Sequence, residues 1–381
     1  MSKITGREEI FKGLNLSEGV IGLINKSQTL VDQAHKYNKD ILAENVRPIE
    51  VDVNRGGIFW SSIEKGIYFG SYGDAGYEAL DPRVFVGILS HELGHYINDA
   101  RDKAREQFYA DKMRDNYDVA AIVGVTKEAE AAYNNWKIAR EIYENNGSLI
   151  SVLGDRPDYV SAPGYDIYHM LTKVYDSNVG KMSADMLEKA MIEVAGSYLA
   201  QASPGANLNV NYYDYYGSAY GASPKRLSHA PVAAVNYSVD FETGLVKSVT
   251  LHFSTGMQQK NQYDRGLLST AALYGPNGQI VEYARYAANG LKTEEIIYDS
   301  IGNGTITRID TNGDGVFDNI KTETRLADGA SVIREDTNGD GVADHNFVVN
   351  GGQRYDLSNV RDAAFADSLL DDATNSTSAI N

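Results

Sequence analysis

The chain has 381 residues, which is enough for two or three domains with their own hydrophobic cores. Its net charge of −17 opposes binding to a phosphate backbone, so we expect no nucleic-acid partner. Cysteine is absent, which excludes disulfides and thiolate metal sites and leaves histidine, aspartate and glutamate as metal ligands.

The first half of the chain has helical periodicity. A long helix is predicted to begin with Asp81 as its N-cap and Pro82 at its first position, because both residues are favoured there. Apolar residues then recur on one broad face of this segment. The other elements predicted in this half are two short strands within 57–70, a second helix over 126–147, and helices at 165–176 and 183–200.

The sequence changes character near residue 200. Residues 201–228 are rich in Tyr, Gly, Ser and Asn without a period, which predicts a linker or a long ordered loop. Residues 229–360 alternate between apolar and polar and carry dipeptides such as Asn277-Gly278 that favour hairpin turns, so we expect a β-rich region. The acidic, polar tail at 361–381 indicates poor order unless it docks.

The segment SHELGHYIND, residues 90–99, falls inside the first long predicted helix. Residues four apart lie on one face of a helix, so His91 and His95 can direct imidazole nitrogens at a single metal ion. Glu92 lies beside them in angle and can take a proton from a water activated by zinc. The motif therefore predicts one Zn²⁺ ion, with Glu92 as the general base.

At these residues the sequence resembles the zincin metallopeptidases, which differ in their third zinc ligand. One zincin type continues the motif with glycine and a third histidine, but those positions hold Asn98 and Arg101 here. The gluzincin type takes a glutamate from a second helix, often followed four residues later by aspartate. Glu130 and Asn134 match that pattern, with asparagine in place of aspartate.

The resemblance implies Glu130 as the third zinc ligand, although three more acidic residues could take this place. Glu128 points about 200° away from Glu130 around the same helix, so only one of the two can face the metal. Asp99 and Asp111 could also supply the carboxylate. We expect Asn134 to be an outer hydrogen-bond partner of the ligand histidines. Asp99 suits that outer role better than the role of a ligand.

The same resemblance implies an α+β fold, with a mostly helical zincin-like domain and a short sheet over 45–200, preceded by a helical segment at 1–44. The strands within 57–70 would supply the edge along which a peptide substrate lies. A residue that stabilises the oxyanion is also expected. Its candidates are Tyr165, Tyr168 and His169, together with the tyrosines of the 201–228 segment, and no spacing rule selects one.

Two nine-residue stretches, 310–318 and 336–344, are close copies offset by 26 residues. Each places oxygen-bearing side chains at positions 1, 3, 5 and 9 and glycine at position 6, which is the pattern of a Ca²⁺-binding loop. An EF-hand would need glutamate at position 12, where Lys321 and Phe347 stand, so the loops resemble thrombospondin type 3 or dockerin-like repeats more closely. The sequence predicts two Ca²⁺ ions. The expected ligands are Asp310, Asn312, Asp314, Val316 (carbonyl) and Asp318 in the first loop, and Asp336, Asn338, Asp340, Val342 (carbonyl) and Asp344 in the second.

We therefore expect a zinc metalloendopeptidase that hydrolyses a protein or peptide substrate. The alternative is a calcium-dependent binding or adhesion protein whose zincin-like domain is catalytically idle. The start of the chain lacks an apolar signal core, and no apolar stretch is long enough to span a membrane. Calcium loops suit a calcium-rich compartment, so we expect a secreted, toxin-like bacterial effector exported without an N-terminal signal peptide, or else a cytoplasmic protein. The sequence identifies no inhibitor or immunity protein.

Overall fold

The computed structural model describes residues 3–71, 80–113, 116–146, 148–153, 167–204, 210–219, 223–240, 243, 245–299, 303–326 and 329–358. The chain divides into two compact units, one of residues 1–114 with 118–222 and one of residues 223–381 with 115–117. Across the described ranges, no helix combines the length and the apolar character needed to cross a bilayer.

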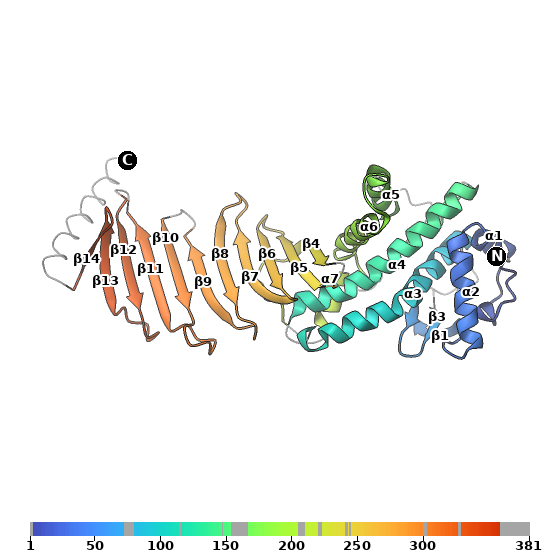
Figure 1. Cartoon of the computed structure of the whole chain (residues 1–381), viewed down its shortest axis with the longest axis horizontal. Helices are drawn as coiled ribbons and strands as arrows, with labels where there is room; N and C mark the ends of the chain where they lie inside the picture. The colour runs from blue at the N-terminus through green and yellow to red at the C-terminus, as the bar shows by residue number, and fades with distance from the viewer. Residues whose placement is uncertain are drawn as a thin grey trace. The chain divides into compact units, whose positions relative to one another are not determined.

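The first unit holds the helices and a small sheet (Figure 1). Its N-terminal part contains a short 3₁₀ helix, Glu9–Phe11, and helices α1 (Glu18–Ile24) and α2 (Gln28–Leu42). The small sheet consists of β1 (Glu50–Gly56), β2 (Ile58–Ser61) and β3 (Gly66–Ser71). The remaining helices are α3 (Pro82–Met113), α4 (Tyr117–Asn146), α5 (Ile167–Asn178), α6 (Ala184–Leu199) and α7 (Tyr212–Ser218).

Helix α3 begins where the sequence predicted, at Pro82. The Asp81 side chain accepts a hydrogen bond from the Arg83 backbone N–H at 2.8 Å, which is the capping interaction expected of that residue. Helix α4 begins at Tyr117, nine residues before the predicted start at Thr126. The added turns are buried on every side, so their apolar residues show no amphipathic period from which a helix could be read.

The segment predicted as a linker contains helix α7. The Asn211 side chain accepts a hydrogen bond from the Asp214 N–H at 2.7 Å and so caps the start of this helix. Tyr213 is fully buried, and its hydroxyl donates to the Asp118 carboxylate on α4. The tyrosine-rich composition hid the helix because it has no helical period, although Tyr213 is a packing residue of the first unit and Tyr215 is exposed.

The small sheet has the strand order β1-β3-β2, so β2 lies at an edge. Strand β1 is parallel to β3, whereas β2 is antiparallel to it. The two predicted strands within 57–70 are confirmed as β2 and β3, and β1 is an element that the sequence analysis missed. The sheet packs on α3 through Phe69, whose ring stacks on Phe85 with centroids 5.1 Å apart.

Helices α3 and α4 lie side by side and run in opposite directions (Figure 1). They approach closely at Gly94, where an added Cβ would lie 2.8 Å from the Ala131 Cα. The buried Asn135 side chain ties the pair further, donating to Ser90 Oγ at 2.8 Å and accepting from the Leu153 N–H at 2.9 Å. This contact fixes which residues of α4 face the motif on α3.

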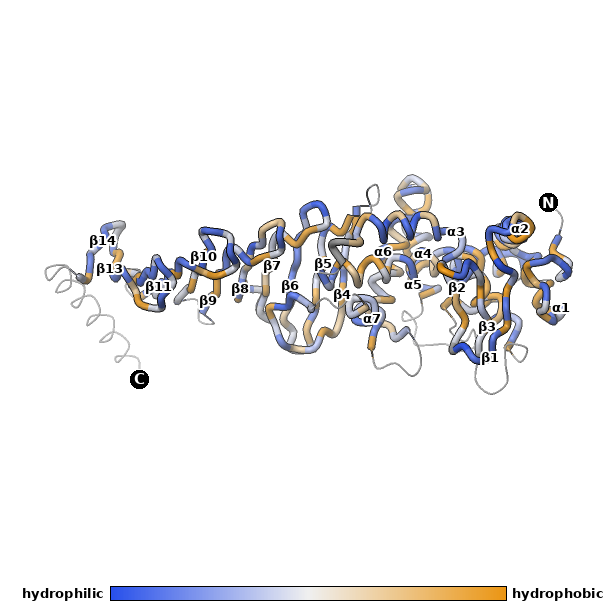
Figure 2. The backbone as a smooth tube through the Cα atoms, turned by 90° about the horizontal axis from the view of Figure 1, so that it is seen from below, coloured by the Kyte–Doolittle hydropathy of each residue, from blue (hydrophilic) through white to orange (hydrophobic). Residues whose placement is uncertain are grey.

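The second unit is built on one antiparallel sheet of eleven strands whose spatial order, β4 to β14, is the order along the chain (Figure 1). The combination of helical and β regions predicted from the sequence is confirmed. Many side chains of β9, β10 and β11 are half-buried, and polar and apolar residues are mixed along these strands (Figure 2). The strands are Val232–Asp240, Leu245–Phe253, Gln258–Asp264, Leu267–Tyr274, Ile280–Tyr286, Lys292–Tyr298, Gly304–Ile309, Asn319–Arg325, Ser331–Asp336, His345–Asn350 and Gln353–Asp356.

Candidate metal centre

The two motif histidines meet a carboxylate from α4. His91 Nε2 lies 3.3 Å from Glu128 Oε2, and His95 Nε2 lies 3.5 Å from the same oxygen. One ligand atom from each of the three side chains falls within 4.8 Å of the others, and no other such His/Asp/Glu group occurs in the part of the chain that the structure describes. The side chains are 10–13% exposed, so the group is enclosed but reachable.

This spacing fits a zinc ion. Ligand atoms 2.0–2.1 Å from a tetrahedral ion are about 3.3 Å from one another. The two separations to Glu128 Oε2 are 3.3 and 3.5 Å, close to that value, and all three ligand atoms lie within 4.8 Å of one another. Two imidazole nitrogens and one carboxylate oxygen are also a donor set that zinc accepts, with a fourth position left for water or substrate.

Glu130, the third ligand implied by the resemblance, lies elsewhere. It is 5% exposed, and its Oε1 accepts a hydrogen bond from Arg105 Nη2 at 2.6 Å. Its Oε2 lies 3.2 Å from Arg101 Nη2. Two residues along a helix correspond to a rotation of about 200°, so α4 cannot direct both Glu128 and Glu130 at the histidines. The structure brings Glu128, rather than Glu130, to the site.

The charges of the group are strongly coupled. Burial acts to lower the pKa of His95, but the carboxylates of Glu128, Glu92 and Asp102 together outweigh it and raise this pKa to about 9. Burial acts to raise the pKa of Glu128, yet the two imidazoles hold it well below its usual range. Without a metal the group is therefore an ion cluster of a carboxylate with imidazolium, and a bound cation would take the place of the protons.

Glu92 is 6% exposed and lies between this group and the sheet edge. Its Oε2 accepts a hydrogen bond from the Trp60 backbone N–H on β2 at 2.7 Å. Burial raises the pKa of Glu92, and the neighbouring imidazoles oppose that rise only in part. A carboxylate with a raised pKa beside two metal-type histidines is placed to accept and return a proton.

Tyr216 of α7 is a site residue that sequence reasoning did not single out. Its hydroxyl donates to Glu128 Oε1 at 2.5 Å, on the oxygen that does not face the histidines. Burial and the Glu128 charge keep the pKa of Tyr216 well above its usual range, so the hydroxyl retains its proton. Tyr212 lies near both Glu128 and Glu92, since their charges add to the effect of burial in raising its pKa. The sequence indicated only that the 201–228 segment is rich in tyrosine, and no spacing rule selected Tyr212 or Tyr216 from its tyrosines.

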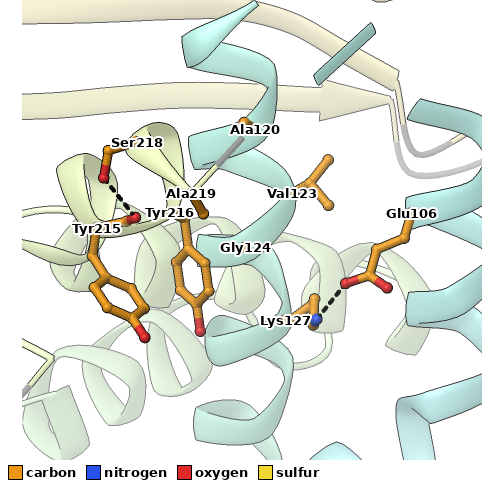
Figure 3. Close-up of a pocket in the computed structure, with 9 residues that line it drawn as sticks. All are labelled: Glu106, Ala120, Val123, Gly124, Lys127, Tyr215, Tyr216, Ser218 and Ala219. Carbon is orange, nitrogen blue, oxygen red and sulfur yellow. Dashed lines mark hydrogen bonds and ion pairs between the residues drawn. The ribbon is translucent and has the colours of Figure 1, made fainter. Parts of the chain in front are cut away.

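A pocket adjoins Tyr216 on the Gly124 side of α4 (Figure 3). Its volume is about 380 Å³, and it is lined by residues of α3, α4 and α7. Lys127 and Glu106 form an ion pair at one wall, with Nζ and Oε1 2.6 Å apart. The Tyr216 ring lies against Gly124, so the pocket and the histidine group share one tyrosine as a boundary.

The two expected outer partners contact other groups. The Asn134 amide donates to the Ser90 carbonyl at 2.8 Å and accepts from Gln33 Nε2 at 2.6 Å. Asp99 accepts hydrogen bonds from Lys103 Nζ at 2.6 Å and Trp60 Nε1 at 3.4 Å. Both residues therefore hold the scaffold around the motif helix, and neither of these contacts is with a histidine. The Asp111 side chain lies outside the described residues.

Of the expected oxyanion candidates, Tyr168 and His169 lie away from the histidine group, whereas Tyr216 and Tyr212 of the 201–228 segment lie beside it. Tyr168 lies near Arg140 and Glu144 of α4, and Arg140 is twelve residues from Glu128 along that helix, which is about 18 Å. His169 is exposed, and its ring packs edge-on against that of Tyr168. Tyr165 lies outside the described residues.

The two repeated loops connect β10 to β11 and β12 to β13, and they have matching hydrogen bonds. Asp310 accepts from the Gly313 and Gly315 N–H groups at 2.6 and 2.8 Å, and Asp336 accepts from Gly339 and Gly341 at 2.7 and 2.8 Å. Asn312, Asp314, Asn338 and Asp340 each accept from the N–H two residues later, while Asp318 and Asp344 accept from Thr311 and Thr337. The Val316 and Val342 side chains are exposed. The expected calcium sites stay a prediction.

No protein-family model matches the chain, and no curated protein sequence matches it significantly. The chemistry of the site is therefore argued from its residues.

Proposed function

We propose that the first unit is a zinc-dependent peptidase of the zincin type, with His91, His95 and Glu128 as the zinc ligands. The observation that supports this most strongly is the spacing of the three ligand atoms, with both histidines 3.3–3.5 Å from one carboxylate oxygen. Glutamate follows the first histidine, as hydrolysis by a metal-activated water requires.

A zinc ion in this group supplies Lewis acidity, which lowers the pKa of water and polarises a carbonyl. Glu92 acts as the general base and later delivers the proton to the leaving amine. The Trp60 N–H orients the Glu92 carboxylate by holding Oε2 at 2.7 Å. The Tyr216 hydroxyl orients Glu128 by binding Oε1, so that Oε2 faces the histidines.

A protein or peptide is the substrate class that the surroundings of the motif favour. Strand β2 is an edge strand of its sheet, and its Trp60 contacts Glu92 directly. An edge strand presents unpaired backbone groups along which an extended peptide can add. A peptide on this edge would carry its scissile bond past Glu92 and the histidines.

The test is hydrolysis of an unfolded protein such as reduced, alkylated albumin by the full chain. We expect Glu92→Gln to lose at least a thousandfold in rate while retaining one zinc per chain. Glu144→Gln is the matched control, since it makes the same change at an exposed position on α4. Zinc binding without hydrolysis in the wild type would contradict the peptidase proposal and favour the alternative, a calcium-dependent binding protein.

A further inference from the structure

A buried ion cluster continues from the metal centre along the seam between α3 and α4. Arg105 bridges two carboxylates, with Nη1 3.0 Å from Asp102 Oδ1 and Nη2 2.6 Å from Glu130 Oε1. Asp102 and Glu130 are each 5% exposed, and the Arg105 side chain is 11% exposed. These three groups carry one net negative charge away from solvent. Glu130 has a second cation in Arg101, whereas Asp102 shares Arg105 with it.

Asp102 lies on the same face of α3 as the motif histidines. It follows His95 by seven residues, which is about 20° short of two full helical turns and about 10 Å along the axis. The electrostatic influence is mutual, since the Asp102 charge acts on His95 and the His95 charge acts on Asp102. A negative charge on Asp102 would therefore attract a cation bound at His95, about two helical turns away.

Such a charge is costly for the fold. A buried carboxylate that shares Arg105 with a second carboxylate, and on which Lys127 acts more weakly, is incompletely neutralised, and burying such a charge costs free energy. Burial, and next the neighbouring Glu130, raise the pKa of Asp102 to about 7, which reflects that cost. Asparagine would keep the shape and the contact area without the charge.

We propose that Asp102 is a positioning residue of the metal centre, whose buried negative charge, fixed by Arg105, strengthens the binding of a divalent cation by His91, His95 and Glu128. This inference rests on the proposed metal site. It predicts that the charge of Asp102 increases the affinity for the cation but decreases the stability of the metal-free protein.

The experiment uses the full chain and Zn²⁺ alone as the probe. The zinc dissociation constant is measured by competition with a chromophoric chelator at 0.05 and 0.5 M NaCl, and thermal unfolding is measured on metal-free protein, both at pH 8, where Asp102, with a pKa of about 7, is ionised. For Asp102→Asn we expect a dissociation constant about three- to tenfold higher at both salt concentrations, because a buried charge is screened little. The metal-free melting temperature should be equal to or above that of the wild type.

Two variants separate charge from structure. Asp102→Glu keeps the charge and should bind zinc within about twofold of the wild type. Glu141→Gln removes a half-buried carboxylate of α4, thirteen residues or about 20 Å from Glu128, and should leave zinc affinity unchanged.

An unchanged zinc affinity in Asp102→Asn, or a loss equal to that of Glu141→Gln, would overturn the inference while leaving the peptidase proposal intact. A weaker affinity accompanied by a lower metal-free melting temperature would also overturn it, since it would show a structural role. Absence of zinc binding by the wild type would overturn the proposed function and this inference together.

Discussion

Gly124 allows the Tyr216 ring to lie directly against α4, and we predict that Gly124→Ala disrupts this packing. A Cβ added at Gly124 would lie 2.1 Å from Tyr216 Cγ, 2.4 Å from Cδ1 and 2.6 Å from Cβ. These separations are far below van der Waals contact, so the ring must move by more than about 1 Å. Its hydroxyl would then leave Glu128, to which it now donates at 2.5 Å.

The size of the effect follows from three contributions. Overpacking costs about 1–3 kcal/mol, and losing a hydrogen bond to a charged group costs about 1.5–3 kcal/mol. Alanine is favoured over glycine inside a helix by about 1 kcal/mol, which offsets part of this loss. We therefore expect Gly124→Ala to lower the free energy of unfolding by about 1.5–5 kcal/mol.

Urea denaturation of metal-free protein measures this change. Trp60 and Trp136 are the two tryptophans of the chain and both belong to the first unit, so their fluorescence reports on its unfolding. Gly22→Ala in α1 is the control, because an added Cβ meets nothing within 4 Å there, and it should stabilise by about 0.5–1 kcal/mol. If Gly124→Ala were as stable as the wild type or more so, the position of Tyr216 against α4 would be wrong.

Three further predictions concern other parts of the chain. The folded-state pKa of Asp102, about 7, exceeds its ordinary value of 3.8, so this residue's contribution to stability is present below pH 4 and is lost as the pH rises through 7. In urea unfolding of metal-free protein, the free energy of unfolding of Asp102→Asn relative to that of the wild type should therefore increase by up to about 4 kcal/mol between pH 4 and pH 8. A difference in unfolding free energy that does not change with pH would contradict this. Glu141 accepts hydrogen bonds from Ser27 Oγ at 2.6 Å and the Thr29 N–H at 3.1 Å at the start of α2, so Glu141→Gln should destabilise the same transition by about 1–2 kcal/mol, and no loss would refute that capping role. Calorimetric titration with Ca²⁺ should find two sites per chain with dissociation constants of about 10⁻⁴–10⁻³ M, reduced to one site in Asp310→Ala, and an absence of heat in the wild type would remove the calcium prediction.

The sequence predicted those parts of the site that depend on position within one helix. His91, His95 and Glu92 needed only the four-residue spacing and the capped start at Pro82, and the structure has both. The third acidic residue could not be selected in this way, because it depends on the rotation of α4 against α3. That rotation is set by contacts between distant residues, such as the approach of Gly94 to Ala131.

Residues contributed by α7 were beyond sequence reasoning for a different reason. The segment has many tyrosines and no period, so it indicates neither a helix nor a preferred residue. Only tertiary packing distinguishes Tyr213, which is buried on Asp118, from Tyr216, which reaches Glu128. The sheet of the second unit was easier to foresee, since alternation and hairpin turns are local signals.

The most direct test of the proposed site is the zinc content of the purified full chain and of two matched variants, measured by mass spectrometry after dialysis against a weak chelator. The wild type should hold one zinc per chain. Glu128→Gln should lose it, whereas Glu130→Gln, the same change two residues away on α4, should retain it. Zinc lost in Glu130→Gln and kept in Glu128→Gln would contradict the assignment of Glu128, and a wild type without zinc would contradict the metal centre itself.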